Sequence, residues 1–95
     1  MAQVRVPAML RSAVGGERVV VAEGHTLREL LGDLEARHHG FAAQVLDPAT
    51  REPRPFVNIY VNDEDVRYLR GLETPVEDGD VVSILPAVAG GGRWA

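Results

Sequence analysis

The sequence predicts an α+β domain in which a mixed β-sheet wraps around one main helix. Three observations lead to this prediction: two short β-branched segments near the N-terminus, one segment of leucines spaced three and four residues apart, and two further strand-like segments in the second half. The helix lies between the second and third strands, which gives a connection long enough for parallel pairing. A single helix covers only one face of a sheet, so we expect the other face to be open.

The first two strands are predicted at residues 3–7 and 18–22. Valines alternate with polar residues in the first segment, as is typical of a half-buried strand. Pro7 has no amide hydrogen to donate and marks the end of this strand. Two glycines at 15–16 indicate a turn, and the β-branched run that follows is expected to pair back on the first strand as a hairpin.

The main helix is predicted to run from Leu27 to just before Gly40. Thr26 and Glu29 have the spacing of a capping box, in which the Glu29 side chain reaches back to the amide of Thr26. The apolar stripe of this helix consists of Leu27, Leu30, Leu31 and Leu34. Gly40 is expected to supply the left-handed residue that ends the helix.

The second half is predicted to contain a short helical turn and loop over 41–55, strands at 56–62 and 81–85, and a short extended piece at 66–67. In the first of these strands, Val57, Ile59 and Val61 point to one face, and Phe56, Asn58, Tyr60 and Asn62 point to the other. We expect the open face of the sheet to carry Phe56, Tyr60 and Val82. This order of strands and helix is that of the β-grasp, or ubiquitin-like, fold.

The last strand stops at Pro86 and leads into three glycines at 90–92, close to the end of the sequence. Glycines add nothing to a packed core, but they make a slim tail that is able to enter the channel of another protein. We therefore predict a folded domain over residues 1–89 and a flexible tail over 90–95. On the residues alone, a frayed end without function explains these glycines equally well.

The composition excludes several classes of protein. The chain has no cysteine, which rules out disulfides, thiolate-bound iron–sulfur or zinc sites and a catalytic thiol. All ten basic residues are arginines, so no lysine is present to form a Schiff base. A net charge of −4 with scattered arginines argues against nucleic acid or anionic membranes as partners. Without a signal or membrane-spanning segment, we expect a cytoplasmic protein.

Two polar groups have simpler explanations than a metal site. His38 and His39 are adjacent, so they diverge by about 100° around a helix, and cationic groups suit its C-terminus. The acidic turn at 63–65 lacks the alternating ligands of a calcium loop. We therefore predict no metal, no bound cofactor and no catalytic residues, and hence no enzyme. Phe56 and Tyr60 are expected either to anchor a partner or simply to pack on the sheet.

Two segments make the chain similar to a known family. They are the run Phe-Val-Asn-Ile-Tyr-Val-Asn-Asp-Glu-Asp-Val-Arg at 56–67, and Asp-Gly-Asp at 78–80 followed by Ile-Leu-Pro-Ala-Val-Ala-Gly-Gly at 84–91. The chain resembles the ubiquitin-like sulfur-carrier proteins of the MoaD/ThiS family from Val4 to Gly91. Within that family it is most similar to the actinobacterial carriers for cysteine synthesis.

The resemblance implies that an E1-like enzyme adenylates the C-terminal glycine with ATP and magnesium and then directs sulfur onto it as a thiocarboxylate. The other partners that it implies are a cysteine synthase dependent on pyridoxal phosphate, or another sulfur acceptor enzyme, and a JAMM-type metalloprotease. The working group would be Gly91, preceded by Gly90, once Gly92, Arg93, Trp94 and Ala95 have been removed; Gly92 is the alternative end. The surface that meets the partners would consist of Phe56, Tyr60, Leu85, Pro86 and Val88.

Other functions remain open at this point. The same carrier is able to serve molybdopterin, thiamine or secondary-metabolite pathways, or to form the small subunit of a molybdopterin synthase. A ubiquitin-like modifier, or an interaction module without sulfur transfer, is the second hypothesis.

Overall fold

The computed structural model describes residues 1–86 of the chain; residues 87–95 lie outside the described part. Five strands form one sheet in the order β2-β1-β5-β3-β4. Their bounds are β1 Ala2–Arg5, β2 Val19–Ala22, β3 Val57–Val61, β4 Glu64–Asp65 and β5 Val81–Pro86. The central pair β1–β5 is parallel and the other neighbours are antiparallel, so the predicted mixed sheet is confirmed.

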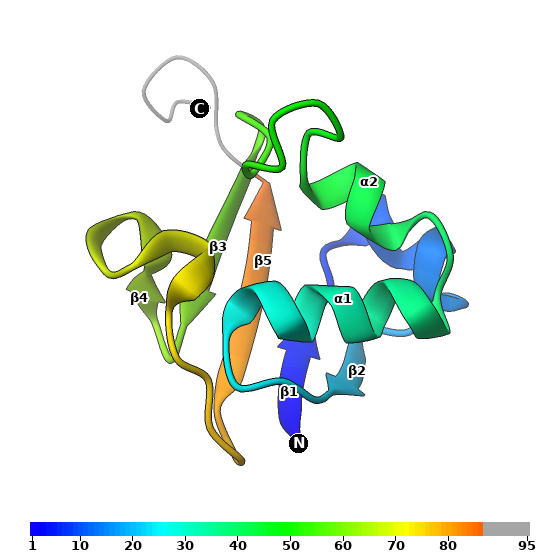
Figure 1. Ribbon diagram of the computed structural model, residues 1–95. Coiled ribbons are helices and arrows are strands. Elements are labelled where there is room, and N and C mark those ends of the chain that lie inside the picture. The colour runs from blue at the N-terminus through cyan, green and yellow to red at the C-terminus, as the bar shows by residue number, and fades with distance from the viewer. Residues whose placement is uncertain (87–95) are drawn as a thin grey trace, which may run out of the picture.

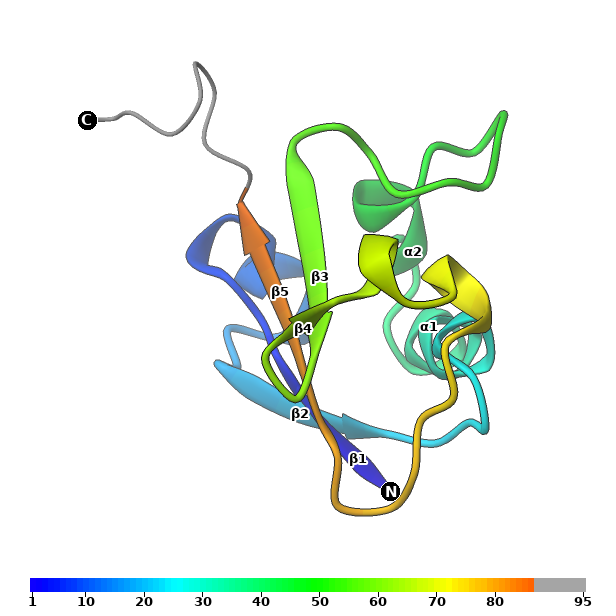
Figure 2. The ribbon, with the colours of Figure 1, turned by 90° about the vertical axis from the view of Figure 1, so that its left-hand side faces the viewer.

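The main helix α1, Leu27–Arg37, crosses one face of the sheet (Figure 1). A short helix α2, Phe41–Val45, follows it, and three 3₁₀ segments complete the fold: η1 Ala8–Val14, η2 Val66–Tyr68 and η3 Gly71–Glu73. Figure 2 shows the same arrangement along the sheet, with both helices on one side of the strands. The architecture is the predicted α+β arrangement of one main helix on a mixed sheet.

The hydrophobic core lies between α1 and the sheet. All four predicted helix leucines are buried, together with the three odd-numbered residues of β3 from Val57 to Val61. Val82 also lies in this core with none of its surface exposed, so its predicted place on the open face is wrong. It faces the helix because its partners across the ladders are Val4 and Val61, which do the same.

Both ends of α1 differ from the prediction: the N-terminal end in the partner of Glu29, and the C-terminal end in the residue at which the helix stops. The Thr26 hydroxyl accepts from the Glu29 amide at 3.2 Å, as expected of an N-cap, but the Glu29 carboxylate accepts from the amide of His25 at 2.8 Å and not from that of Thr26. The helix ends at Arg37, earlier than predicted. Gly40 does have a left-handed φ of 93°, but it precedes α2, and the Glu35 carboxylate accepts from the Gly40 amide at 3.0 Å to hold this turn.

Two connections also differ from the prediction. Strands β1 and β2 pair antiparallel as expected, but η1 lies between them and buries Leu10 and Val14 before the turn at Gly15. The short strand is Glu64–Asp65 and not 66–67, because the turn before it takes only two residues. The Asp65 carboxylate accepts from the Arg67 amide at 2.9 Å, which starts a 3₁₀ turn where an extended piece had been predicted.

The turn between β3 and β4 gives a stability prediction. Asn62 and Asp63 have positive φ angles of 50° and 73°, which is the geometry of a two-residue hairpin turn that favours Asn-Gly. We expect Asp63→Gly to raise the free energy of unfolding by about 0.5–1 kcal/mol, because glycine adopts this conformation without strain. Thermal unfolding followed by circular dichroism measures the change.

Asn62→Gly in the same turn is the matched control. The Asn62 side chain donates to Asp80 and accepts from the Val81 amide, both at 2.9 Å, and so ties the turn to the start of β5. Glycine removes both bonds, so this variant is expected to unfold at a lower temperature than the parent. An Asp63→Gly protein no more stable than the parent would contradict the account of the turn.

Candidate functional site

The C-terminal segment departs from the middle of the sheet. β5 lies between β1 and β3, and its last pairs with β3 are Asn58–Leu85 and Val57–Pro86. Pro86 is therefore held by a ladder, at the end of the sheet opposite the N-terminus (Figure 1). Residues after Pro86 start from a fixed position on the domain.

Large apolar side chains lie exposed around this position. Leu85 keeps 46% of its surface exposed and Phe56 keeps 48%, and Pro86 is exposed as well. Tyr60 lies farther along β3, half-buried, opposite Ser83 on one side and Asp65 on the other. Of the surface predicted to meet partners, Leu85 and Tyr60 thus alternate onto the same face of the sheet, Pro86 ends β5, and Phe56 lies in the turn before β3. Val88 lies outside the described residues.

Phe56 does not share a face with Tyr60, as the alternation of a strand had predicted. It precedes β3 and belongs to a turn, so the alternation does not reach it. Its side chain instead lines a pocket of about 350 Å³ on the helix side of the sheet. We call this the Phe56 pocket; its residues are Met9 and Leu10 from η1, Ala43 and Gln44 from α2, and Arg54 and Phe56.

The open face of the sheet carries alternate residues of all its strands. Residues directly opposite each other in a ladder share a face, which places Arg5, Ser83, Tyr60 and Asp65 in one row across β1, β5, β3 and β4. At the edge of this row the Arg67 guanidinium donates to the Asp65 carboxylate at 2.7 Å. This bond holds the pKa of Asp65 below its ordinary value, so both groups stay charged and paired.

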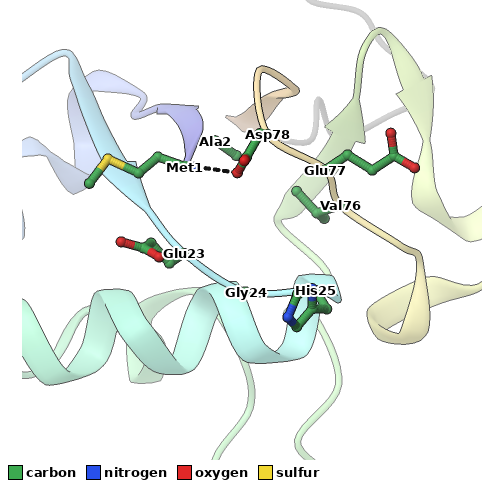
Figure 3. Close-up of a pocket in the computed structure, with 8 residues that line it drawn as sticks. All are labelled: Met1, Ala2, Glu23, Gly24, His25, Val76, Glu77 and Asp78. Carbon is green, nitrogen blue, oxygen red and sulfur yellow. Dashed lines mark hydrogen bonds and ion pairs between the residues drawn. The ribbon is translucent and has the colours of Figure 1, made fainter.

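A second pocket, of about 290 Å³, lies at the opposite end of the sheet (Figure 3). There the ammonium group of Met1 forms an ion pair with Asp78, and the Gly79 amide donates to the Met1 carbonyl at 3.0 Å. This pairing lowers the pKa of Asp78. The contacts join the turn before β5 to the start of β1, far from Pro86, so they stabilise the sheet and do not belong to the surface around the tail.

The two polar groups weighed in the sequence form ordinary surface contacts. His39 lies at the end of α1 with its Nδ1 3.9 Å from the Glu35 carboxylate. Within residues 1–86, no three or more His, Asp and Glu side chains are placed to hold a metal ion. No helix of the described part is both long enough and apolar enough to cross a membrane.

The described residues therefore offer an exposed surface around Pro86, the residue after which the C-terminal segment begins. The glycines that the sequence singled out, Gly90, Gly91 and Gly92, and the residues after them, Arg93, Trp94 and Ala95, lie outside the described part. The Phe56 pocket is the feature that sequence reasoning missed. It joins residues 9–10, 43–44 and 54–56, and no pattern along the chain signals that these segments meet.

Comparisons with known proteins point to one family. The model of the ThiS family matches residues 4–91, and so ends at the second of the three glycines. The sulfur carrier protein CysO of Mycobacterium tuberculosis is 51% identical over 89 residues, which is 93% of this chain and 96% of CysO. The small archaeal modifier protein 3 of Haloferax volcanii is 35% identical over 91 residues, 94% of this chain and 97% of that protein.

Solved structures agree with the sequence comparisons. The crystal structure of M. tuberculosis CysO matches with a TM-score of 0.89 at 47% identity and covers 93% of this chain and 100% of that one. The CysO chain from the Amycolatopsis orientalis BexX/CysO complex matches with a TM-score of 0.87 at 47% identity, over 95% of this chain and 99% of that one. The predicted β-grasp fold is thereby confirmed.

Proposed function

We propose a sulfur-carrier chemistry for this chain, which belongs to the ThiS family and is a homologue of the sulfur carrier CysO. In this chemistry the carboxylate of a C-terminal glycine becomes a thiocarboxylate that donates its sulfur to a product. The observation that carries the proposal is the 51% identity to CysO over 93% of the chain, combined with a family match that ends at residue 91. The carrier itself is a protein substrate and not an enzyme.

The chemistry needs two steps on the terminal carboxylate. The carboxylate first attacks the α-phosphorus of ATP, which forms an acyl-adenylate and releases pyrophosphate. A donor at the oxidation level of sulfide then attacks the acyl carbon, the thiocarboxylate forms, and AMP leaves. Adenylation is necessary because a carboxylate oxygen is a poor leaving group. A glycine without a side chain leaves its carbonyl open to both attacks.

The reactive glycine is Gly91 in this proposal, with Gly92 as the alternative. In the sequence Gly91 is followed by Gly92, Arg93, Trp94 and Ala95. Hydrolysis of the peptide bond between Gly91 and Gly92 would expose the carboxylate of Gly91, with Gly90 behind it as a second residue without a side chain. The end of the family match at residue 91 supports this choice of bond.

The surface around Pro86 is proposed to bind the larger enzymes that act on the tail. Exposed apolar side chains at Phe56 and Leu85 suit such a contact, since burying them against a partner removes apolar area from water. Pro86, Val88 and Tyr60 complete the proposed surface. Because Pro86 ends a central strand, a partner that binds this surface also lies beside the residue from which the tail continues.

The partners of the proposal are an E1-like adenylating enzyme that uses ATP and magnesium, a cysteine synthase dependent on pyridoxal phosphate, and a JAMM-type metalloprotease that releases the product. Cysteine synthesis in the cytoplasm is the pathway that the similarity to CysO favours. A. orientalis CysO has been solved in complex with BexX. That complex supports the idea that this chain also binds a partner protein. Another sulfur acceptor enzyme in place of the cysteine synthase stays within the proposal.

Processing of the tail tests the proposal directly. The purified 95-residue chain, incubated with lysate of its own host, is expected to lose its last four residues and to end at Gly91. Mass spectrometry of the intact protein identifies the end. A Gly91→Val variant is the control and should resist cleavage, because a branched side chain next to the cut bond hinders the protease. A chain that keeps all 95 residues and still accepts sulfur would contradict the proposal.

A protein modifier is the second candidate, and the 35% identity to a small archaeal modifier protein favours it. A modifier forms isopeptide bonds to lysines of other proteins, and a carrier does not need to. An affinity-tagged chain ending at Gly91, incubated in host lysate with ATP and analysed on denaturing gels, separates the two functions. A ladder of conjugates that survives reducing agent supports the modifier, whereas a thiocarboxylate on the free chain supports the carrier.

A further inference from the structure

We propose that the edge strand β2 pairs with β2 of a second copy of this chain, so that the two sheets join into one. The pairing is antiparallel, with a twofold axis at Val20 that places Val19 of one copy opposite Val21 of the other. This inference goes beyond the proposed function, because neither adenylation nor sulfur transfer requires a second carrier.

The two edges of the sheet differ in how well they are protected from such pairing. Natural proteins shield edge strands by keeping them short and by placing charged residues on them. The edge strand β4 has both features, since it consists of Glu64 and Asp65 alone. The opposite edge strand β2 (Figure 1) has no charged residue, and it leaves 45% of Val19 and 42% of Val21 exposed. β2 is therefore the edge that is open to another strand.

The ladder with β1 determines which backbone groups of β2 face outward. The Val6 amide donates to the Arg18 carbonyl at 2.8 Å. Hydrogen-bonded pairs alternate along an antiparallel ladder, so the even-numbered residues of β2 bond to β1. The amides and carbonyls of Val19 and Val21 point the other way, out of the sheet. Within residues 1–86 β2 pairs with no strand other than β1, so these donors and acceptors are available to a further strand.

The outward edge is closed immediately before and after these two valines. On one side the Glu17 amide donates to the Val14 carbonyl at 3.3 Å, so the chain turns away before β2 begins. On the other side the Asp33 carboxylate of α1 accepts from the Glu23 amide at 3.0 Å. A further strand therefore has to bond to the two valines between these points.

A second copy of β2 fits this short open edge. In a hydrogen-bonded antiparallel pair, each residue both donates to and accepts from the residue opposite. With the twofold axis at Val20, Val19 and Val21 of one copy face Val21 and Val19 of the other, and every outward donor and acceptor of these valines is satisfied. An axis at Val21 would instead place Val19 opposite Glu23, whose amide already bonds to Asp33. The open groups thus select one register.

Charged groups beside the valines complement each other in this register. Arg18 of one copy lies opposite Ala22 of the other, and Ala22 is buried on the helix side of the sheet. Asp33 binds the amide of the next residue, so Arg18 comes beside the Asp33 carboxylate of the other copy. Within residues 1–86 Arg18 forms no ion pair of its own. On the open face, the exposed valines of both copies cover one another and lose contact with water.

The pairing leaves both candidate sites accessible. The surface around Pro86 is carried by β5, β3 and the turn before β3, and not by β2. Because β2 runs antiparallel to its copy, β5 of one copy also runs opposite to β5 of the other. The two Pro86 residues therefore lie at opposite ends of the joined sheet, and one dimer is able to present its two sites to two separate partner molecules.

Sedimentation equilibrium of the full chain tests the pairing. The mass is expected to rise from 10.3 kDa toward twice that value between micromolar and millimolar concentration, because a strand this short gives a small interface and a weak dimer. The double variant Val19→Lys, Val21→Lys should raise the dissociation constant at least about tenfold, since it sets like charges directly opposite each other.

The double variant Met9→Lys, Leu69→Lys is the matched control. It adds the same charge at side chains exposed to the same degree, 44% and 42%, that lie outside β2. It should dimerise like the parent, and circular dichroism should show that both double variants are folded. A dimer lost equally in both would mean that added charge, and not the edge of β2, decides the association, and would overturn the proposal.

The double variant Val19→Lys, Val21→Glu tests the register. With the axis at Val20 each new lysine faces a new glutamate of the other copy, so this variant should dimerise at least as tightly as the parent. A variant of this kind that is as monomeric as Val19→Lys, Val21→Lys would overturn the proposal, and so would a parent chain that keeps a mass of 10.3 kDa at millimolar concentration. A monomeric chain is still able to accept sulfur, so this inference and the proposed function fail separately.

Discussion

A chain that ends at Gly91 is expected to be adenylated at least about a hundredfold faster than the full 95-residue chain. Adenylation requires the carboxylate oxygen to lie in line with the α-phosphate of ATP in the activating enzyme, and a displacement of about 1 Å costs about a hundredfold in rate. Each additional residue moves the carboxylate by about 3.3–3.6 Å along an extended chain. Four extra residues, one of them tryptophan, place it far outside that geometry.

A series of chains that end at residues 90, 91, 92 and 95 measures the effect. Exchange of labelled pyrophosphate into ATP, catalysed by the E1-like enzyme of the host, reports adenylation of each chain. The rate should be highest for the chain ending at Gly91 and should fall steeply on both sides of it. A maximum at 92 would move the reactive residue to Gly92. Equal rates for all four chains would contradict the requirement for a defined C-terminal glycine.

Gly24→Ala is expected to be the most damaging alanine substitution among the glycines of the described part of the chain. Gly24 lies between β2 and α1 and lines the pocket at the N-terminal end of the sheet (Figure 3). A β-carbon at this position would lie 2.5 Å from the Leu30 amide nitrogen and 2.8 Å from the Glu29 carbonyl carbon. Both atoms belong to the first turns of the helix backbone and cannot move aside alone.

The expected loss is about 3 kcal/mol of the free energy of unfolding, at the upper end of the range for overpacking. Urea denaturation followed by circular dichroism measures it. Gly32→Ala is the matched control, because Gly32 is in the interior of the same helix with open space around it. That variant should gain about 0.5–1 kcal/mol from better helix propensity. Equal stabilities for the two variants would show that the close approach at Gly24 is not a constraint.

Local sequence patterns predicted most of the fold because each helix and strand has its own spacing of apolar residues. The leucine stripe of α1 and the alternation in β3 each select a buried face without help from distant residues. Val82 was misplaced although the start of its strand was predicted correctly, because its face depends on how β5 pairs with its neighbours Val4 and Val61. Asn62, which is far away in sequence, helps to fix this pairing through its bonds to Asp80 and Val81. A register that is fixed by a long-range contact cannot be predicted from the residues of the strand alone.

The candidate site, too, has one part that the sequence predicts and one part that it does not. The glycines after Pro86 and the family resemblance are properties of the sequence, so the sequence alone predicts a reactive end, which lies outside the described residues. The surface beside it was not, because Phe56 leaves the alternation of β3 in a turn and meets η1 and α2 across the fold. That turn is also the reason why Phe56 and Tyr60 do not share a face of the sheet. The periodicity of a strand or a helix does not indicate which distant segments of the chain come into contact.

The C-terminal carboxylate of this chain is proposed to accept sulfur. The direct test is the intact mass of the chain ending at Gly91 after incubation with the E1-like enzyme of its host, ATP, magnesium and a sulfide donor. Exchange of one oxygen for sulfur predicts a gain of about 16 Da, confined to the C-terminal peptide and absent without ATP. An unchanged mass, with the enzyme shown to be active on its other substrates, would contradict the account.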